Sequence, residues 1–162
     1  MLIAVDFVSR RTFEELEAAP DMAAISINDP GDPAPKNLSQ FSRSLSLFFL
    51  DIEPEPGEVL RDKDAAFNAY CAEAIRTFVQ QLHTTDGHYR LVVHCRMGAS
   101  RSAAVALLAK ALTGCHFPRE RDAHNANRYV VSLAADHWGI PVYIPAKPMT
   151  EDYLYLPSSL QV

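Results

Sequence analysis

One run of nine residues, 94–102, combines the residue types that bind and attack a phosphate group. It reads His94-Cys95-Arg96-Met97-Gly98-Ala99-Ser100-Arg101-Ser102, so five residues separate a cysteine from an arginine. A cysteine thiolate is a strong nucleophile, and the planar guanidinium of arginine matches two phosphate oxygens at once. About 1 in 100,000 chains of this length would carry these His, Cys, Gly, Arg and Ser residues at these offsets by chance. The run predicts a phosphate-binding loop with a nucleophile at its base; the alternative is a buried structural cysteine beside a surface arginine.

The segments on either side of this run are those that a phosphate-binding loop requires. Residues 91–93 (Leu-Val-Val) are typical of a short buried strand, and residues 102–112 are rich in alanine and leucine, which favour a helix. A loop between a strand and a helix directs backbone N–H groups and the positive end of the helix dipole at one point. We therefore expect a phosphate or sulfate ion to be bound by the loop residues Arg96, Met97, Gly98, Ala99, Ser100 and Arg101.

Five residues of the run have separate expected roles. Cys95 is the candidate nucleophile, because amide groups that point inward stabilise a thiolate. Arg101 is the candidate ligand for two phosphate oxygens. Gly98 allows the backbone to turn and to approach the ligand closely. Ser102 is expected to form a hydrogen bond with the Cys95 sulfur, and His94 to order the loop by hydrogen bonding rather than to act as a base.

This run resembles the His-Cys-x5-Arg-Ser/Thr signature of the cysteine-dependent protein tyrosine and dual-specificity phosphatases. The resemblance implies that Cys95 attacks phosphorus to give a phosphocysteine, that an aspartic acid protonates the leaving oxygen, and that water then hydrolyses the intermediate. It implies neither a metal ion nor another cofactor. The signature itself covers nine residues, and the order of predicted elements from about residue 2 to residue 138 agrees with the family. The motif is specific for the superfamily but not for the substrate.

The candidate general acid is Asp51, which follows the predicted strand residues 47–50. Ligands of parallel sheets bind beyond the carboxyl ends of the strands, so this position suits an acid above the loop. In the family, bacterial-type members often carry a strand followed by Asp-Ile, which resembles Asp51-Ile52. Asp62 and Asp64 are alternatives: they lie 33 and 31 positions before Cys95, against 44 for Asp51, and the shorter separations resemble compact dual-specificity phosphatases. Both are also expected simply as acidic residues in the first turn of a helix.

The composition indicates one ordinary globular domain, residues 1–162. The chain is 48% hydrophobic and 22% charged, and its net charge of −5 argues against a general binder of nucleic acid or anionic membranes. Three cysteines without a disulfide-like pattern indicate a reducing compartment. Residues 1–6 are too short and too soon acidic for a signal peptide, and no apolar stretch approaches the ~20 residues of a membrane span. We expect a cytoplasmic protein, and the sequence leaves its oligomeric state open.

Strand and helix patterns alternate along the chain, which predicts an α/β fold: a central, mostly parallel sheet of four to five strands with helices on both faces. The expected strands are Leu2–Val8, Met22–Ile27, Leu45–Leu50 and residues 91–93. The first expected helix starts at a capping box at Thr12 and ends near Pro20. Three further helices are expected over residues 67–82, 102–112 and Arg119–His137. Residues 140–162 contain several prolines and tyrosines and are expected to form an extended C-terminal tail.

The helix over residues 67–82 has apolar residues at alternating spacings of three and four. These residues are Phe67, Tyr70, Cys71, Ala74, Ile75, Phe78, Val79 and Leu82. The spacing makes Cys71 a core residue first, although a thiol there could also trap an oxidised Cys95 in a disulfide.

These observations predict a phosphatase of phosphate monoesters, with phosphotyrosine on a protein as the first substrate class. Phosphoserine, phosphothreonine or a small phosphorylated metabolite remain open, because the segment 29–44 that is expected to form one pocket wall does not fix the pocket depth. Arg96 adds a charge that could favour inositol phosphates, but the pattern favours its interpretation as a solvated side chain. Two other classes remain: a phosphate-binding module without turnover, and a sulfur-transfer enzyme that uses a cysteine persulfide.

Overall fold

The computed structural model describes residues 1–148, in which strands and helices alternate. The strands are β1 (Leu2–Ser9), β2 (Met22–Asn28), β3 (Arg43–Phe48) and β4 (Tyr89–Cys95). The α-helices are α1 (Arg10–Glu14), α2 (Ala69–Thr84), α3 (Arg101–Thr113) and α4 (Arg128–Trp138). Short 3-10 helices are η1 (Lys36–Gln40), η2 (Asp62–Asp64) and η3 (Glu120–Asn125). The part of the expected tail from 149 to 162 lies outside the described residues.

The four strands form one parallel sheet in the order β1-β4-β2-β3. β4 lies inside the sheet, and its residues 91–95 are all buried, as expected for a parallel strand that is covered on both faces. The register pairs Ser9 with Cys95 and Asn28 with Phe48, so the carboxyl ends of the strands meet along one edge of the sheet. The predicted α/β fold with a parallel central sheet is confirmed, and the candidate nucleophile ends one of its two central strands.

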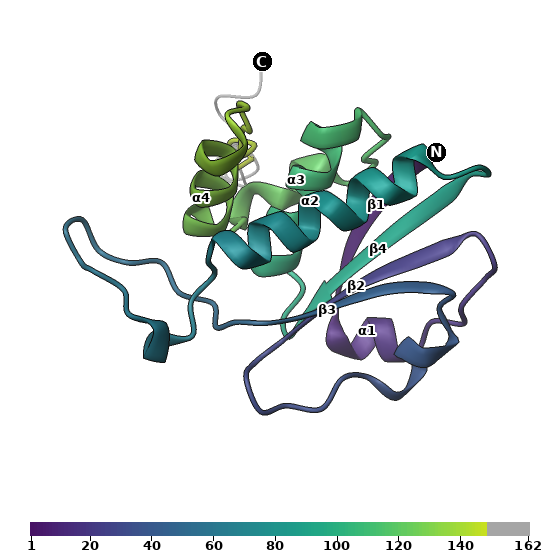
Figure 1. Cartoon of the computed structure of the whole chain (residues 1–162), viewed down its shortest axis with the longest axis horizontal. Coiled ribbons are helices and arrows are strands. Elements are labelled where there is room, and N and C mark those ends of the chain that lie inside the picture. The colour runs from purple at the N-terminus through teal and green to yellow at the C-terminus, as the bar shows by residue number, and fades with distance from the viewer. Residues whose placement is uncertain (149–162) are drawn as a thin grey trace, which may run out of the picture.

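Helices cover both faces of the sheet (Figure 1). α2, α3 and α4 pack on one face, where they enclose the main hydrophobic core, and α1 packs on the other. α3 is buried continuously from Arg101 to Ala109, because its alanines allow it to lie close to both the sheet and the neighbouring helices. A smaller cluster, with Phe13, Leu38 and Phe41 at its centre, fills the space under α1. The helix that follows the candidate phosphate loop is therefore rigidly held.

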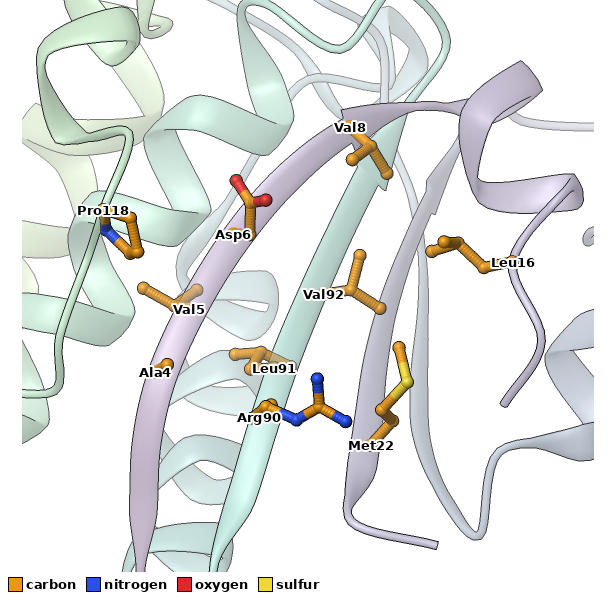
Figure 2. Close-up of a pocket in the computed structure, with 10 residues that line it drawn as sticks. All are labelled: Ala4, Val5, Asp6, Val8, Leu16, Met22, Arg90, Leu91, Val92 and Pro118. Carbon is orange, nitrogen blue, oxygen red and sulfur yellow. The ribbon is translucent and has the colours of Figure 1, made fainter. Parts of the chain in front are cut away.

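On the other face of the sheet, α1 covers only the half that lies nearest the carboxyl ends of the strands. Beside it lies a hollow of about 330 Å³ among β1, β4 and the start of β2 (Figure 2). The side chains that line it include Asp6, Val8, Leu16, Met22, Arg90 and Val92. Both charged side chains of this lining are engaged: Asp6 pairs with Arg119 at 2.8 Å, and Arg90 donates to Asp21 through two hydrogen bonds of 2.8 and 3.0 Å. This hollow is not the candidate site.

The boundaries of the first helix and of the third strand differ from those predicted. The first helix begins at Arg10 rather than at Thr12, because Ser9 is its N-cap and accepts a hydrogen bond from the Thr12 amide at 3.1 Å. It ends at Glu14, well before Pro20. The third strand ends at Phe48 rather than at Leu50, since the Leu50 amide turns away from the sheet to the Ala65 carbonyl at 2.8 Å.

The predicted helix Arg119–His137 is also wrong, because the chain breaks there into η3 and α4. Ala126 and Asn127 leave the helical conformation between them, and the Asn127 side chain accepts a hydrogen bond from the Val130 amide at 2.9 Å to cap α4. Tyr70 does not lie on the apolar face of α2: it is 88% exposed, because it lies in the first turn and the buried face of the helix starts at Ala72.

Candidate active site

The candidate phosphate loop connects the end of β4 to the start of α3 and rests against the end of β1. Gly98 has a φ of +71°, and a Cβ at this position would lie 2.2 Å from the Ser9 amide nitrogen. Only glycine fits this close approach without moving the backbone. The Arg10 amide also donates to the Arg96 carbonyl at 3.3 Å. The end of β1 therefore fixes the shape of the loop from behind.

Cys95 lies at the base of the loop and is only 2% exposed. Its sulfur accepts a hydrogen bond from the Gly98 amide at 3.3 Å and lies 3.1 Å from the Ser102 hydroxyl oxygen. Both contacts stabilise negative charge on the sulfur when the two groups donate. Ser102 is thus in contact with the sulfur, as its position in the sequence predicted.

The donors of the loop are free to bind an anion. Within residues 1–148 the amide groups of Met97, Ala99 and Ser100 donate no hydrogen bond. Ser100 is the N-cap of α3 but its side chain does not cap the helix, because the hydroxyl donates to Asp51 Oδ1 at 2.8 Å instead. The first turn of α3 thus keeps open amide groups, which together with the helix dipole favour an anion at this point.

Arg101 is buried beside the loop, with 4% of its surface exposed. Its Nη1 donates to Asp29 Oδ1 at 2.7 Å and to the Phe49 carbonyl at 2.6 Å. Its Nε is buried and has no hydrogen-bond partner among the described residues. The edge of the guanidinium formed by Nε and Nη2 therefore makes no hydrogen bond within residues 1–148, and the side chain lines the hollow described below. Asp29 and Phe49, which follow β2 and β3, hold the guanidinium in place.

A hollow of about 390 Å³ joins these groups at the carboxyl edge of the sheet. Its lining consists of Asp29, Leu50, Asp51, Ile52, Cys95, Arg96, Met97, Ser100 and Arg101. Of the three candidate acids, Asp51 is in this lining, and its Oδ1 also accepts a hydrogen bond from Asn127 Nδ2 at 2.7 Å. Asp64 instead accepts from the Arg61 amide at 2.7 Å within its own short helix. The side chain of Asp62 lies outside the part of the chain that the structure describes.

His94 lies under the loop and points away from the hollow. It is fully buried, its Nε2 lies 2.7 Å from the Ser26 hydroxyl oxygen, and its ring lies 4.4 Å from the Phe13 ring. Burial, reinforced by the positive charge of Arg10, lowers the pKa of His94 to about 4. The imidazole is therefore neutral at neutral pH, which suits a residue that orders the loop.

A directed chain of hydrogen bonds continues from His94. Asn28 Nδ2 donates to the Ser26 hydroxyl at 3.0 Å, and Arg10 Nη1 donates to Asn28 Oδ1 at 3.1 Å. Since Ser26 already accepts from Asn28, its own hydrogen is available for His94 Nε2. The chain ties the ends of β1, β2 and β4 together beneath the loop.

Arg96 lies at the rim of the hollow, and its side chain is 74% exposed. Its Nη1 lies 3.8 Å from Asp29 Oδ2, a separation at which an exposed ion pair contributes little. Arg96 also lines a neighbouring hollow of about 300 Å³ together with Arg10, Asp29 and Asp32. The positive charge of this second hollow is offset by carboxylates, so it does not favour a second phosphate.

Cys71 packs partly buried against the main core, where burial raises the pKa of its thiol. This agrees with its interpretation as a core residue.

Sequence reasoning missed three residues that hold the site: Asp29, Ser26 and Asn127. Asp29 directly follows β2, so the rule on carboxyl ends of strands could have identified it. Asn127 carried the residue type of an N-cap, but the predicted continuous helix concealed it.

No protein-family model, curated protein or solved structure matches this chain. Among residues 1–148, no helix has the length and apolar character needed to cross a bilayer. The same residues contain no group of three or more His, Cys, Asp or Glu side chains arranged to hold a metal ion. A functional assignment therefore depends on the geometry of the hollow.

Proposed function

We propose that the protein is a phosphatase that hydrolyses phosphate monoesters through a phosphocysteine at Cys95. The observation that carries the proposal is the convergence on one hollow of a buried thiol with donors on its sulfur, an arginine with an unpartnered Nε, and a carboxylic acid. These are the nucleophile, the phosphate ligand and the acid that transfer of a phosphoryl group requires.

In the first step the Cys95 thiolate attacks phosphorus, and the bond from phosphorus to the ester oxygen breaks. The protonated Asp51 gives its proton to that oxygen, so the alcohol leaves neutral. In the second step the Asp51 carboxylate takes a proton from water as the water oxygen attacks phosphorus. The phosphorus–sulfur bond breaks, the Ser102 hydroxyl donates to the departing sulfur, and inorganic phosphate leaves. Arg101 and the loop amides bind the three equatorial oxygens throughout.

Two features favour turnover over phosphate binding alone. Asp51 lines the hollow that holds Cys95, so an acid is available to the leaving group. The Ser102 hydroxyl lies 3.1 Å from the sulfur, where it can stabilise the thiolate that leaves when the phosphocysteine breaks down. For substrate we propose phosphotyrosine on a protein, because the rim of the hollow carries the apolar side chains of Leu50, Ile52 and Met97, which suit an aromatic ring.

The test is hydrolysis of p-nitrophenyl phosphate by the wild type, Cys95→Ser and Asp51→Asn. We expect turnover by the wild type and none by the serine variant. Asp51→Asn should lower kcat/KM, which reports the first step alone, by 10²- to 10⁴-fold with phenyl phosphate and far less with p-nitrophenyl phosphate, whose phenolate leaves without a proton. Hydrolysis that survives in Cys95→Ser would contradict the phosphocysteine. Release of sulfite from thiosulfate in the presence of cyanide, without phosphatase activity, would favour sulfur transfer instead.

Peptides that contain phosphotyrosine, phosphoserine or phosphothreonine, compared with inositol phosphates, test the substrate class. We expect the highest kcat/KM for the phosphotyrosine peptide. A preference for an inositol polyphosphate would contradict the proposed class while leaving the chemistry of Cys95 intact.

A further inference from the structure

Asn127 is a polar side chain with no exposed surface, placed between α4 and the segment that carries Asp51. Its Oδ1 accepts a hydrogen bond from the Val130 amide at 2.9 Å. Its Nδ2 donates to Asp51 Oδ1 at 2.7 Å and to the Ile52 carbonyl at 3.2 Å. Because the amide of α4 requires the carbonyl oxygen on one side, the NH2 group necessarily faces Asp51.

The backbone of Asn127 extends this link to the phosphate loop. Its amide nitrogen donates to the Ser100 carbonyl at 3.1 Å, and the next amide, that of Arg128, donates to the Glu53 side chain at 2.8 Å. The segment with the acid, the phosphate loop and the start of α4 therefore meet at Asn127. A displacement of any one of them would be transmitted to the others through these bonds.

Capping of α4 does not by itself explain this residue. Serine, threonine or aspartate also cap helices, and none of them has an NH2 group to donate. Burial of an amide is costly unless its hydrogen bonds are satisfied, and here the Nδ2 bonds all go to residues 51 and 52. The NH2 group of Asn127, which capping of α4 does not require, is thus the group that holds Asp51.

The contact also decides which oxygen of Asp51 carries the proton. Oδ1 receives two hydrogen bonds, from Asn127 Nδ2 and from the Ser100 hydroxyl at 2.8 Å, whereas Oδ2 accepts none from the described residues. A carboxylic acid whose Oδ1 is occupied by two donors holds its proton on Oδ2. Asp51 is otherwise exposed, so these bonds also restrict its rotamers and keep it at the hollow.

We propose that Asn127 is a positioning residue, which holds Asp51 through its Nδ2 and directs the acid proton to Oδ2 for transfer to the leaving oxygen. This inference rests on the proposed phosphatase function. It adds a residue from the far part of the chain, 76 positions beyond Asp51, to the machinery of proton transfer.

Asn127→Ser separates positioning from capping, because serine keeps an N-cap oxygen and lacks the NH2 group. With phenyl phosphate we expect kcat/KM, which reports the first step alone, to fall at least about tenfold, a part of the 10²- to 10⁴-fold effect of a general acid. With p-nitrophenyl phosphate the fall in kcat/KM should be less than about threefold, since this leaving group needs little protonation. In an Asp51→Asn background, Asn127→Ser should cause no further loss with either substrate.

The matched control is Asn68→Ser. Asn68 also caps a helix, accepting from the Cys71 amide at 3.0 Å, but it is exposed and has no contact with Asp51. We expect this variant to keep the wild-type ratio of the two activities. Thermal unfolding checks that each variant is folded, and Asn127→Thr, which also keeps a capping hydroxyl, replaces Asn127→Ser if that protein does not fold.

An equal loss with both substrates, or a further loss in the Asp51→Asn background, would overturn the inference and make Asn127 a purely structural residue. Such a result would leave the proposed function intact, because hydrolysis that depends on Cys95 would still be present. Absence of that hydrolysis in the wild type would overturn the function and this inference together.

Discussion

The neutral His94 under the loop makes the stability of the protein depend on pH. Its imidazole is fully buried, and its Nε2 lies 2.7 Å from the Ser26 hydroxyl. A second proton on the imidazole would place a positive charge in the core near Arg10 and Arg101. We expect the folded protein to resist this protonation down to a pH of about 4.

The pKa of His94 differs between the folded and the unfolded protein, and this difference sets the sign and size of the pH dependence of stability. The unfolded chain binds a proton at His94 below pH about 6.5, whereas burial first, and the charge of Arg10 second, lower the pKa of His94 in the folded protein to about 4. Between these values the unfolded state holds the additional proton. The free energy of unfolding therefore falls as the pH falls, by up to about 1.4 kcal/mol per pH unit. Over the whole interval the loss is roughly 3 kcal/mol, a large part of the 5–15 kcal/mol typical of a domain.

The assay is urea unfolding of the wild type and of His94→Gln at pH 7.5 and at pH 4.5. Glutamine stays neutral at both values, so the difference between the two proteins removes the effects of other titrating groups. At pH 7.5 we expect the variant to be less stable by about 1–3 kcal/mol, because the buried Ser26 hydroxyl loses its partner. At pH 4.5 this difference should shrink or reverse. A difference that is the same at both pH values would refute the argument that His94 is held neutral.

Three further substitutions test the site. Gly98→Ala should lower turnover at least about 100-fold and should lower Tm more than the control Gly139→Ala does. Gly139 has a similar φ of +67° but open space around it, so its substitution should cost only about 1–2 kcal/mol of stability, and equal Tm values for the two variants would contradict the close packing of Gly98 on β1. Arg101→Lys should lower kcat/KM by about 10²- to 10³-fold in steady-state kinetics, and a loss below tenfold would contradict binding of two phosphate oxygens by the guanidinium. Asp29→Asn should lower kcat/KM about tenfold by loosening Arg101, while Asp32→Asn, an exposed neighbour, should leave it within about twofold.

The features that the sequence predicted correctly are those that local patterns determine. The strand before the phosphate loop, the loop itself and the alanine-rich helix after it are contiguous, and their geometry follows from residues that are neighbours in the chain. The positive φ of Gly98 is likewise a local feature, because glycine adopts this conformation without steric strain. The parallel sheet followed in turn from the alternation of strands and helices, because parallel strands need crossovers.

The errors arose where a contact between distant segments overrides the local pattern. Residues 119–137 have the composition of one helix, yet Asn127 breaks it by bonding to Asp51. Tyr70 fits the apolar spacing of α2, but the packing of the helix on its neighbours begins one turn later. Asp29 stayed unassigned because its partner, Arg101, lies 72 positions further along the chain. No window of sequence contains both members of these pairs.

The position of Asp51 at the hollow shows why placement in the sheet, rather than separation in the sequence, decides which residues lie near Cys95. Separation counts all residues between acid and nucleophile, including the segment before α2 that projects from the body of the molecule (Figure 1) and α2 itself. Those residues add length without moving the strand ends. Asp51 remains at the hollow because the Phe49 amide still bonds to the Asn28 carbonyl at 3.1 Å, so the chain leaves the sheet only two residues before the acid. Shortening the projecting segment should therefore change the separation of Asp51 from Cys95 in the sequence and leave their distance in space the same.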